Sequence, residues 1–271
     1  MSAAVAWAER PRIASMAYVS FKDYAADSRK DRALFRGIYT DTWLTPSHRL
    51  EIGFDFSDIG FRDGFEMQQR EFTLAYTYAY SPVWRWRGGI HFLDSEDIFS
   101  DQGRVLFAGA RYEIFDRWDA GLDLTWSRYP QHPAEISATQ LTAHWGWNFR
   151  RRHDYTWRGD LRSYYIHLNR DPGTGDRHLF SIEERLSWIT NRWQASVFGW
   201  YGRQSFAVRN DGFAVFNLSS IHHGGFGCEI SIAISANTTL GTRVSTEYFL
   251  DTPIGPETRS VTTMFNIGHT F

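Results

Sequence analysis

Apolar and polar residues alternate along most of this chain. In the final segment, Val261–Phe271, bulky apolar side chains alternate with smaller or polar ones. Successive side chains of a β-strand point to opposite faces, so a period of two predicts strands with one apolar and one polar face. We expect about fourteen such strands, at 13–24, 33–43, 48–60, 67–80, 84–94, 104–114, 118–128, 136–149, 155–168, 177–189, 193–205, 223–235, 239–250 and 258–271.

The expected strands are long, and their connections alternate between short and long. Most strands exceed the roughly 9 to 11 residues that a tilted strand needs to cross a bilayer. No apolar run approaches the roughly 18 to 20 residues that a spanning helix requires. Short turns are expected near 46–47, 81–82, 116–117, 150–152, 190–191 and 236–237, whereas the longer links are 25–32, 61–66, 95–103, 129–135, 169–176, 206–222 and 251–257.

Aromatic residues gather at the short-turn ends of the expected strands. A soluble core would concentrate large rings in mid-strand, whereas a membrane interface favours rings that are half wet and half apolar. This girdle indicates that the apolar face of each strand contacts hydrocarbon and that the polar face lines a lumen. Its expected members are Trp43, Tyr80, Trp84, Trp86, Phe115, Trp118, Trp147, Phe149, Tyr155, Trp157, Trp188, Trp193 and Phe271.

The closing strand, which ends on Phe271, resembles the assembly signal of Gram-negative outer-membrane β-barrels. The resemblance implies an all-β fold, a transmembrane antiparallel up-and-down barrel of about fourteen strands over 13–271, located in the bacterial outer membrane. It also implies contact with outer-membrane lipids, lipopolysaccharide and the barrel-assembly machinery. Residues 1–12 are expected to be an N-terminal extension, either the remnant of a signal peptide or the end of an upstream helical domain.

Charge and cysteine content exclude several classes of function. The formal net charge of −2 argues against binding to nucleic acid, which needs a basic surface. The single cysteine, Cys228, allows no intrachain disulfide and no cysteine-based metal cluster. Lys22 and Lys30 are the only lysines, so most cationic side chains are arginines, whose planar fork suits fixed contacts with carboxylates and phosphates.

The alternate positions of each strand, which face away from the apolar side, carry candidate pore-lining residues of both charges. These charges can pair across strands and hold the barrel in shape. They can also create a selective path, with Phe198, Trp200 and Tyr164 as stacking faces for sugars. The long link 206–222 can fold inward as a constriction or stand outward as a receptor surface. The candidates are Glu51, Asp55, Glu71, Arg85, Arg87, Arg111, Glu113, Asp119, Asp123, Arg158, Asp160, Arg162, Glu183, Arg185, Arg243 and Glu247.

Catalysis and metal binding have little support in the sequence. Ser219 and Ser220 lie close to His222 and His223, but the order differs from the Ser-His motifs of barrel lipases and lipid A deacylases. The alternative is a polar loop with two solvated histidines. We therefore expect no catalytic residue, no metal ligand and no cofactor.

The sequence predicts a hydrophilic conduit, meaning a porin-like channel or the outer-membrane pore of an export system. In size and ending the chain resembles the carboxy-terminal barrels of exopolysaccharide exporters, which implies periplasmic export partners and a polysaccharide as cargo. Two alternatives remain. One is a closed barrel that acts as a receptor, adhesion or scaffold element through its outer loops, and the other is a lipid-modifying enzyme.

Overall fold

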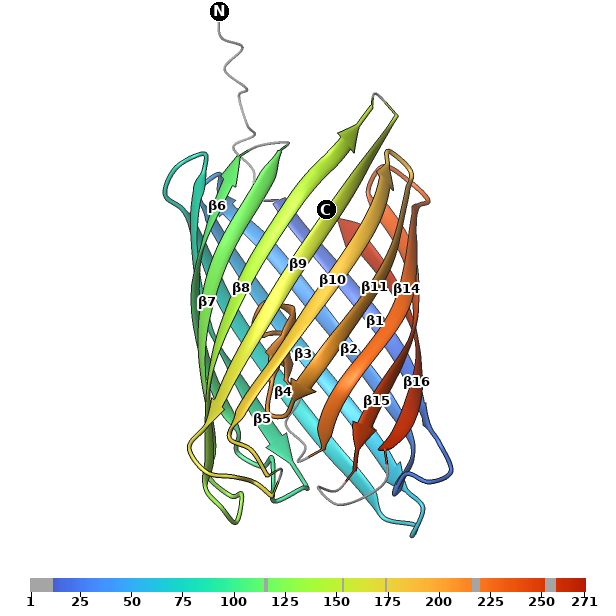
Figure 1. Ribbon diagram of the computed structural model, residues 1–271. Helices are drawn as coiled ribbons and strands as arrows, with labels where there is room; N and C mark the ends of the chain where they lie inside the picture. The colour runs from blue at the N-terminus through green and yellow to red at the C-terminus, as the bar shows by residue number, and fades with distance from the viewer. Residues whose placement is uncertain (1–11, 115–116, 153, 174, 216–219, 252–256) are drawn as a thin grey trace, which may run out of the picture.

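Strands that are neighbours in the sequence pair antiparallel and close into a barrel (Figure 1). The structure is a computed structural model that describes residues 12–114, 117–152, 154–173, 175–215, 220–251 and 257–271. Within these ranges the barrel has fourteen strands, as predicted. They are β1 (Arg12–Tyr24), β2 (Lys30–Thr45), β3 (His48–Phe61), β4 (Glu66–Ala79), β5 (Trp84–Ser95), β6 (Arg104–Ile114), β7 (Trp118–Tyr129), β8 (Ile136–Arg151), β9 (Tyr155–Leu168), β10 (His178–Thr190), β11 (Trp193–Gln204), β14 (Ile221–Ala233), β15 (Thr238–Leu250) and β16 (Glu257–Thr270).

The first and last strands close the barrel. β1 pairs with β16 from Ala14 opposite Thr270 to Tyr24 opposite Ser260, and the amide of Phe271 donates to the carbonyl of Ile13 at 2.8 Å. Closure leaves the ladder without a free edge, which is a requirement for a sheet that crosses a bilayer. No helix in the described ranges is long and apolar enough to cross a membrane.

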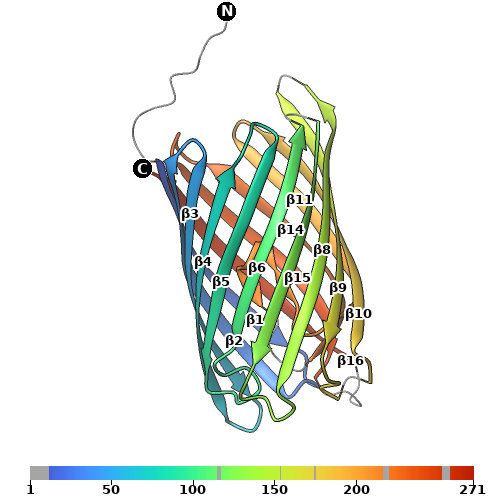
Figure 2. The same cartoon turned by 90° about the vertical axis from the view of Figure 1, so that its left-hand side faces the viewer.

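The two ends of the barrel differ, and the difference follows the predicted turn lengths. The start of β1, the end of β16 and the short turns lie at one end, and the long loops lie at the other (Figures 1 and 2). At the short-turn end, consecutive ring contacts link Trp84 to Tyr112 at 5.0 Å, Tyr112 to Trp118 at 5.5 Å and Trp118 to Trp145 at 6.4 Å. Trp84 and Trp118 belong to the expected interfacial girdle, and Tyr112 and Trp145 extend it.

One member of the expected girdle, Trp43, does not face the membrane. The Trp43 ring lies 5.5 Å from the guanidinium of Arg49, whose side chain also reaches Asp41 and Glu51 on the inner wall. Trp43 therefore faces the lumen, and its assignment to the lipid-facing ring was wrong. Phe115 and residues 1–11 lie outside the described residues.

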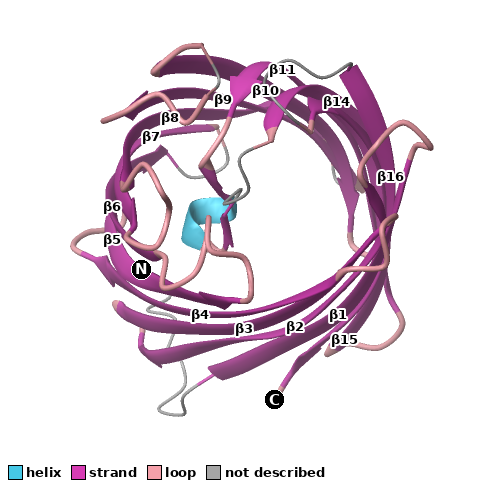
Figure 3. Ribbon diagram, turned by 90° about the horizontal axis from the view of Figure 1, so that it is seen from below, coloured by secondary structure: helices cyan, strands magenta, loops and turns pink. Residues whose placement is uncertain are grey.

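The β11–β14 connection folds into the barrel (Figure 3). It contains β12 (Val208–Arg209), the short 3-10 turn η1 (Asn210–Gly212) and β13 (Ala214–Val215), and we call residues 205–215 the plug. The alternative in which this segment stands outward as a receptor surface is wrong. The inward fold is held by contacts that strands distant in the sequence supply.

A dry apolar cluster packs beneath the first part of the plug. Phe206 and Ala207 are fully buried there, against inward-facing residues of β5 to β10. Burying such side chains stabilises the folded state by roughly 1.5–3 kcal/mol each. The inner surface is therefore not polar throughout, and the plug is fixed to the wall by packing as well as by charge. The cluster includes Leu93, Val105, Phe107, Tyr129, Ile136, Ala138, Ile166, Leu168 and Leu179.

Candidate functional site

Asp211, at the tip of the plug, is held by arginines from three strands. Its carboxylate lies 2.8 Å from Arg111 on β6 and 3.3 Å from Arg162 on β9. Its backbone carbonyl accepts a hydrogen bond from Arg87 on β5. Burial favours a raised pKa for Asp211, but Arg162, Arg111 and Arg87 outweigh burial and lower the pKa to about 2. The carboxylate is therefore ionised at neutral pH.

The plug backbone adopts an uncommon conformation at the point where these arginines meet it. Asn210, Asp211 and Gly212 all have positive φ, at 49°, 56° and 97°. Asn and Asp tolerate the left-handed region better than most residues, and glycine has no side-chain penalty there. A Cβ at position 212 would stand 2.4 Å from the Phe107 ring, so only glycine fits. These residues therefore allow the backbone of the plug to pack closely against the barrel wall at Phe107.

Gln140 and Glu183 hold the strand that leads into this turn. The Gln140 amide donates to the carbonyl of Val208 at 2.6 Å and accepts from the amide of the same residue at 2.9 Å. Glu183 pairs with Arg209, whose guanidinium lies 5.3 Å from the Trp200 ring. Both partners of that pair are largely buried, so neither charge could remain in place without the other.

On the opposite side, the plug reaches across the lumen to β2 and β3. The Phe213 ring meets the Tyr39 ring edge-on at 5.3 Å between centroids. It also lies over Gly53, where a Cβ would come within 3.0 Å of the Phe213 ring. The plug therefore spans the barrel from the β5–β9 wall to the β2–β3 wall.

A cavity of about 970 Å³ runs beside the plug, and we call it the lane. Residues of β1 to β4 and β14 to β16 line it, together with the Asn210–Val215 side of the plug. At the short-turn end its lining includes Arg12, Asn237 and His269. The lane is the space that the plug leaves open along the wall where β1 and β16 pair.

At the long-loop end of the lane, a lysine and two aromatic rings meet. Lys30 donates to Ser220 at 2.9 Å and to Asp251 at 3.2 Å. Its ammonium lies 5.7 Å from the Tyr24 ring and 5.3 Å from the Phe249 ring, and those rings contact each other at 5.9 Å. Lys30, Tyr24 and Phe249 therefore contact one another and form one cluster at this end of the lane.

The wall of the lane offers rings and charges to a passing solute. Tyr18 and Tyr39 stack at 5.9 Å, and both hydroxyls donate to one carboxylate oxygen of Asp55 at 2.6 Å. Across the lane, the Arg243 guanidinium lies 4.2 Å from the Phe198 ring. Among the described residues, Arg243 has no carboxylate within 4 Å, in contrast to the other candidate arginines.

The sixteen candidate lumen residues occupy inward-facing positions, and many of them meet in pairs. Arg85 contacts Glu113 at 3.0 Å and Arg87 contacts Glu51 at 3.0 Å. Arg158 bridges Asp119 and Asp160 at 2.6 and 2.7 Å, and His144 lies beside both acids. Other contacts join Arg185 to Glu229, Glu183 to Arg209, Glu247 to Lys22, Glu71 to His91, and Asp55 to the two tyrosines. Asp123 lines a small recess behind the plug.

Several residues of the site were not among the sequence candidates. Asp211 and Arg209 were missed because the plug was treated as a loop of undecided direction. The Asn210-Asp-Gly212 triplet is a turn signal that could have located the tight turn, although not its position inside the barrel. Glu229 and Lys22 share the inward parity of their strands and could have been found by the same rule as the other candidates.

The serine and histidine residues near the outer rim do not form a catalytic pair in the described ranges. The Ser220 hydroxyl accepts from Lys30, and Ser219 lies outside the described residues. His222 is buried with its Nδ1 3.9 Å from Glu247, whereas His223 lies 3.5 Å from Glu257. The interpretation of His222 as solvated was therefore wrong. Within the described ranges, no group of three or more His, Cys, Asp or Glu is placed to hold a metal ion.

Comparison with known proteins gives similarity of fold at low sequence identity. No family model matches the chain, and no curated protein matches it. A solved structure described as a bacterial polysaccharide outer membrane secretin has a TM-score of 0.60 at 11% identity, over 95% of this chain and 98% of that one. The CymD monoaromatic hydrocarbon channel has a TM-score of 0.58 at 8% identity, over 96% and 88%. A Pseudomonas aeruginosa FadL homologue has a TM-score of 0.51 at 9% identity, over 96% and 89%.

The closed barrel, the aromatic girdle and the similar solved structures together define the class of protein. The protein is a bacterial outer-membrane β-barrel, as the sequence predicted. More particularly, its described residues form a closed fourteen-stranded antiparallel barrel, structurally similar to proteins described as a bacterial polysaccharide outer membrane secretin and a monoaromatic hydrocarbon channel.

Proposed function

We propose that the protein is a passive outer-membrane channel in which the plug restricts passage to the lane. The observation that supports this proposal is the lane itself, which remains beside a plug that spans the lumen. Its wall carries both charges and stacking rings, which suits hydrated polar solutes that must bind weakly enough to leave. In this proposal the protein has no catalytic role.

The proposed cargo is a hydrophilic solute or a single polymer strand such as a polysaccharide. Stacked tyrosines beside a carboxylate, as at Tyr18, Tyr39 and Asp55, offer a sugar both an apolar face and hydrogen-bonding groups. The polysaccharide secretin of similar fold supports the polymer version. In that version periplasmic export partners would meet the short-turn end, and the barrel-assembly machinery would recognise the closing strand.

The test is electrical and osmotic. Protein reconstituted in a planar bilayer is expected to give discrete conductance steps, and proteoliposomes are expected to swell in small sugars. Oligosaccharides of increasing length then separate the two kinds of cargo, since a polymer path admits long, thin chains that a small-solute path excludes. Silence from correctly folded protein would instead support the closed scaffold, an alternative that the contacts among Tyr24, Lys30 and Phe249 at the long-loop end of the lane favour.

Arg243 is expected to set the charge preference of the lane. It lines the lane and lacks a carboxylate partner in the described structure, so its charge acts on the solute. Changing Arg243→Glu should lower the anion-to-cation permeability ratio by about tenfold or more, because each unit charge near the path contributes ~1 kcal/mol even in water. Reversal potentials under a salt gradient measure the ratio. Arg243→Lys should keep it near the wild-type value, and equal ratios for all three proteins would contradict the assignment.

A further inference from the structure

Two arginines lie side by side on the outer surface of the barrel. Arg104 on β6 and Arg128 on β7 are directly opposite each other in the register, and both are exposed. Their neighbours in the chain, Val105 and Ser127, are buried on the inner side. Directly opposed residues have Cβ atoms about 4.5–5.5 Å apart, and like charges at that distance destabilise a sheet. The pair therefore calls for a counter-charge.

The described part of the chain supplies no such counter-charge. Neither arginine has a carboxylate within 4 Å there, and the outward-facing Asp94 of β5 stands opposite Arg70 instead. Arg36 shows the contrasting arrangement, because it also faces outward but pairs with Asp58 at 3.0 Å. The arginine pair thus leaves an open site for an anion on the outer surface.

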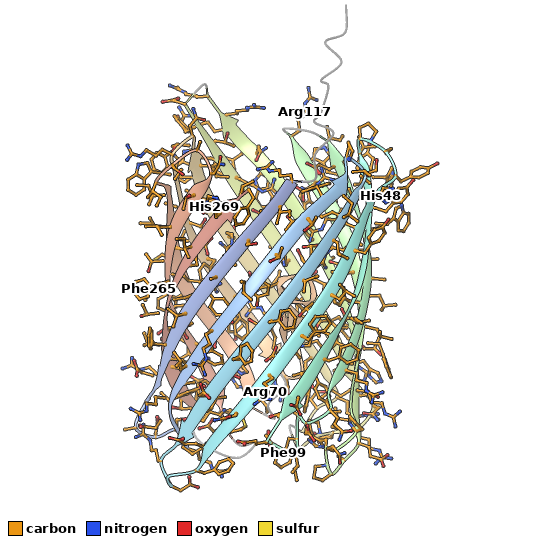
Figure 4. The ribbon with its side chains drawn as sticks, turned by 180° about the vertical axis from the view of Figure 1, so that it is seen from behind. His48, Arg70, Phe99, Arg117, Phe265 and His269 are labelled. Carbon is orange, nitrogen blue, oxygen red and sulfur yellow. The ribbon has the colours of Figure 1, made fainter. Side chains whose placement is uncertain are left out.

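The depth of the pair in the membrane indicates which anion it meets. Trp118, in the short-turn girdle, and Arg128 are ten residues apart on β7. At ~3.4 Å per residue and a tilt of ~40°, that separation spans about 26 Å, close to the ~25 Å height of the apolar band of such barrels. On the membrane side, the next outward pair is Leu106 opposite Trp126, and both side chains are exposed. The arginines therefore lie at the hydrocarbon boundary of the long-loop end, the end where Figure 4 shows Arg70.

We propose that Arg104 and Arg128 bind a phosphate group of lipid A, with the acyl chains of the lipid resting on Leu106 and Trp126. Long loops of outer-membrane barrels face the cell exterior, where the leaflet consists of lipopolysaccharide. Two guanidinium groups can hold one phosphate through paired, charge-assisted hydrogen bonds. The site is independent of the lane, since it lies on the other face of the wall.

The proposal is tested by binding of purified lipid A. Folded protein in detergent is titrated with diphosphoryl lipid A, and the bound lipid is counted by native mass spectrometry. The double variant Arg104→Gln and Arg128→Gln is expected to bind about tenfold more weakly or worse, since each lost hydrogen bond to a charged group contributes roughly a factor of ten. Arg36→Gln, which alters an arginine that already has a partner, should bind like wild type.

Two further experiments distinguish lipid A from free phosphate as the ligand, and a loss of binding from a loss of folding. Dephosphorylated lipid A should bind wild type as weakly as diphosphoryl lipid A binds the double variant, and millimolar inorganic phosphate should not displace the lipid. Arg104→Glu supplies the missing carboxylate, so it should abolish lipid A binding while the barrel keeps or gains heat resistance. Equal lipid A affinity of wild type and both variants, or full displacement by inorganic phosphate, would overturn the proposal.

Discussion

Asp211→Asn is expected to raise single-channel conductance severalfold and to shift selectivity toward anions. Asn tolerates the left-handed backbone as well as Asp does, so the substitution removes the charge without changing the local conformational preference. Arg111 and Arg162 then lose the carboxylate that holds the plug, and their uncompensated charges face the lumen. Planar-bilayer recordings measure the conductance and the reversal potential in one experiment.

A matched control and a pH series accompany this prediction. Asp176→Asn removes a carboxylate from the β9–β10 loop, 3.6 Å from Arg203, and should leave conductance unchanged. The pKa of Asp211 is lowered to about 2, so its contribution to plug docking is complete above its ordinary pKa of ~3.9 and is lost as the pH falls toward 2. Wild-type conductance should therefore be constant from pH 5 to 8 and rise between about pH 4 and 2. An Asp211→Asn channel with wild-type conductance would show that charge does not hold the plug.

The largest loss of stability is expected from Arg158→Met. Arg158 stands between Asp119 and Asp160, with hydrogen bonds of 2.6 Å to the first and 2.7 Å to the second. Without it, two partly buried carboxylates face each other beside His144. Removing one partner of such a buried group costs about 3 kcal/mol or more, because the remaining charges are left unpaired. Urea unfolding in lipid vesicles measures the change in the free energy of unfolding.

A surface ion pair provides the comparison for Arg158. Arg36→Met breaks the exposed contact with Asp58, and such pairs contribute only about 0–1 kcal/mol. If the two variants lose similar stability, the Arg158 cluster is not a structural brace of the wall, and its charges are then better explained by passage of solute.

The alternation of side chains was enough to predict the wall of the barrel but not its contents. Asp119, Arg158 and Asp160 were placed on the inner face by parity alone, because a strand repeats every two residues. Their convergence into one cluster depends on register, and register is set by contacts between strands rather than by any one strand. Alternation therefore predicts which residues face the lumen but not which of them contact each other.

The inward fold of the plug could not be predicted for a different reason. Asp211 gains its arginine partners only once β5, β6 and β9 stand around it, and these partners lie between 49 and 124 residues away in the sequence. The sequence carries a second signal of this inward fold. Ile136, Ile166 and Leu179 are apolar residues at inward-facing positions near the long-loop ends of their strands. A water-filled lumen would have polar residues at such positions. Such a patch indicates that something packs against the wall.

The placement of the two lysines makes the barrel suited to chemical labelling. Lys22 and Lys30 carry the only primary amines among its side chains, and both line the lane toward its long-loop end. An amine-reactive reagent applied to intact cells would therefore reach these two side chains only through the long-loop end of the barrel, and the size limit of the reagent would give the width of the opening there.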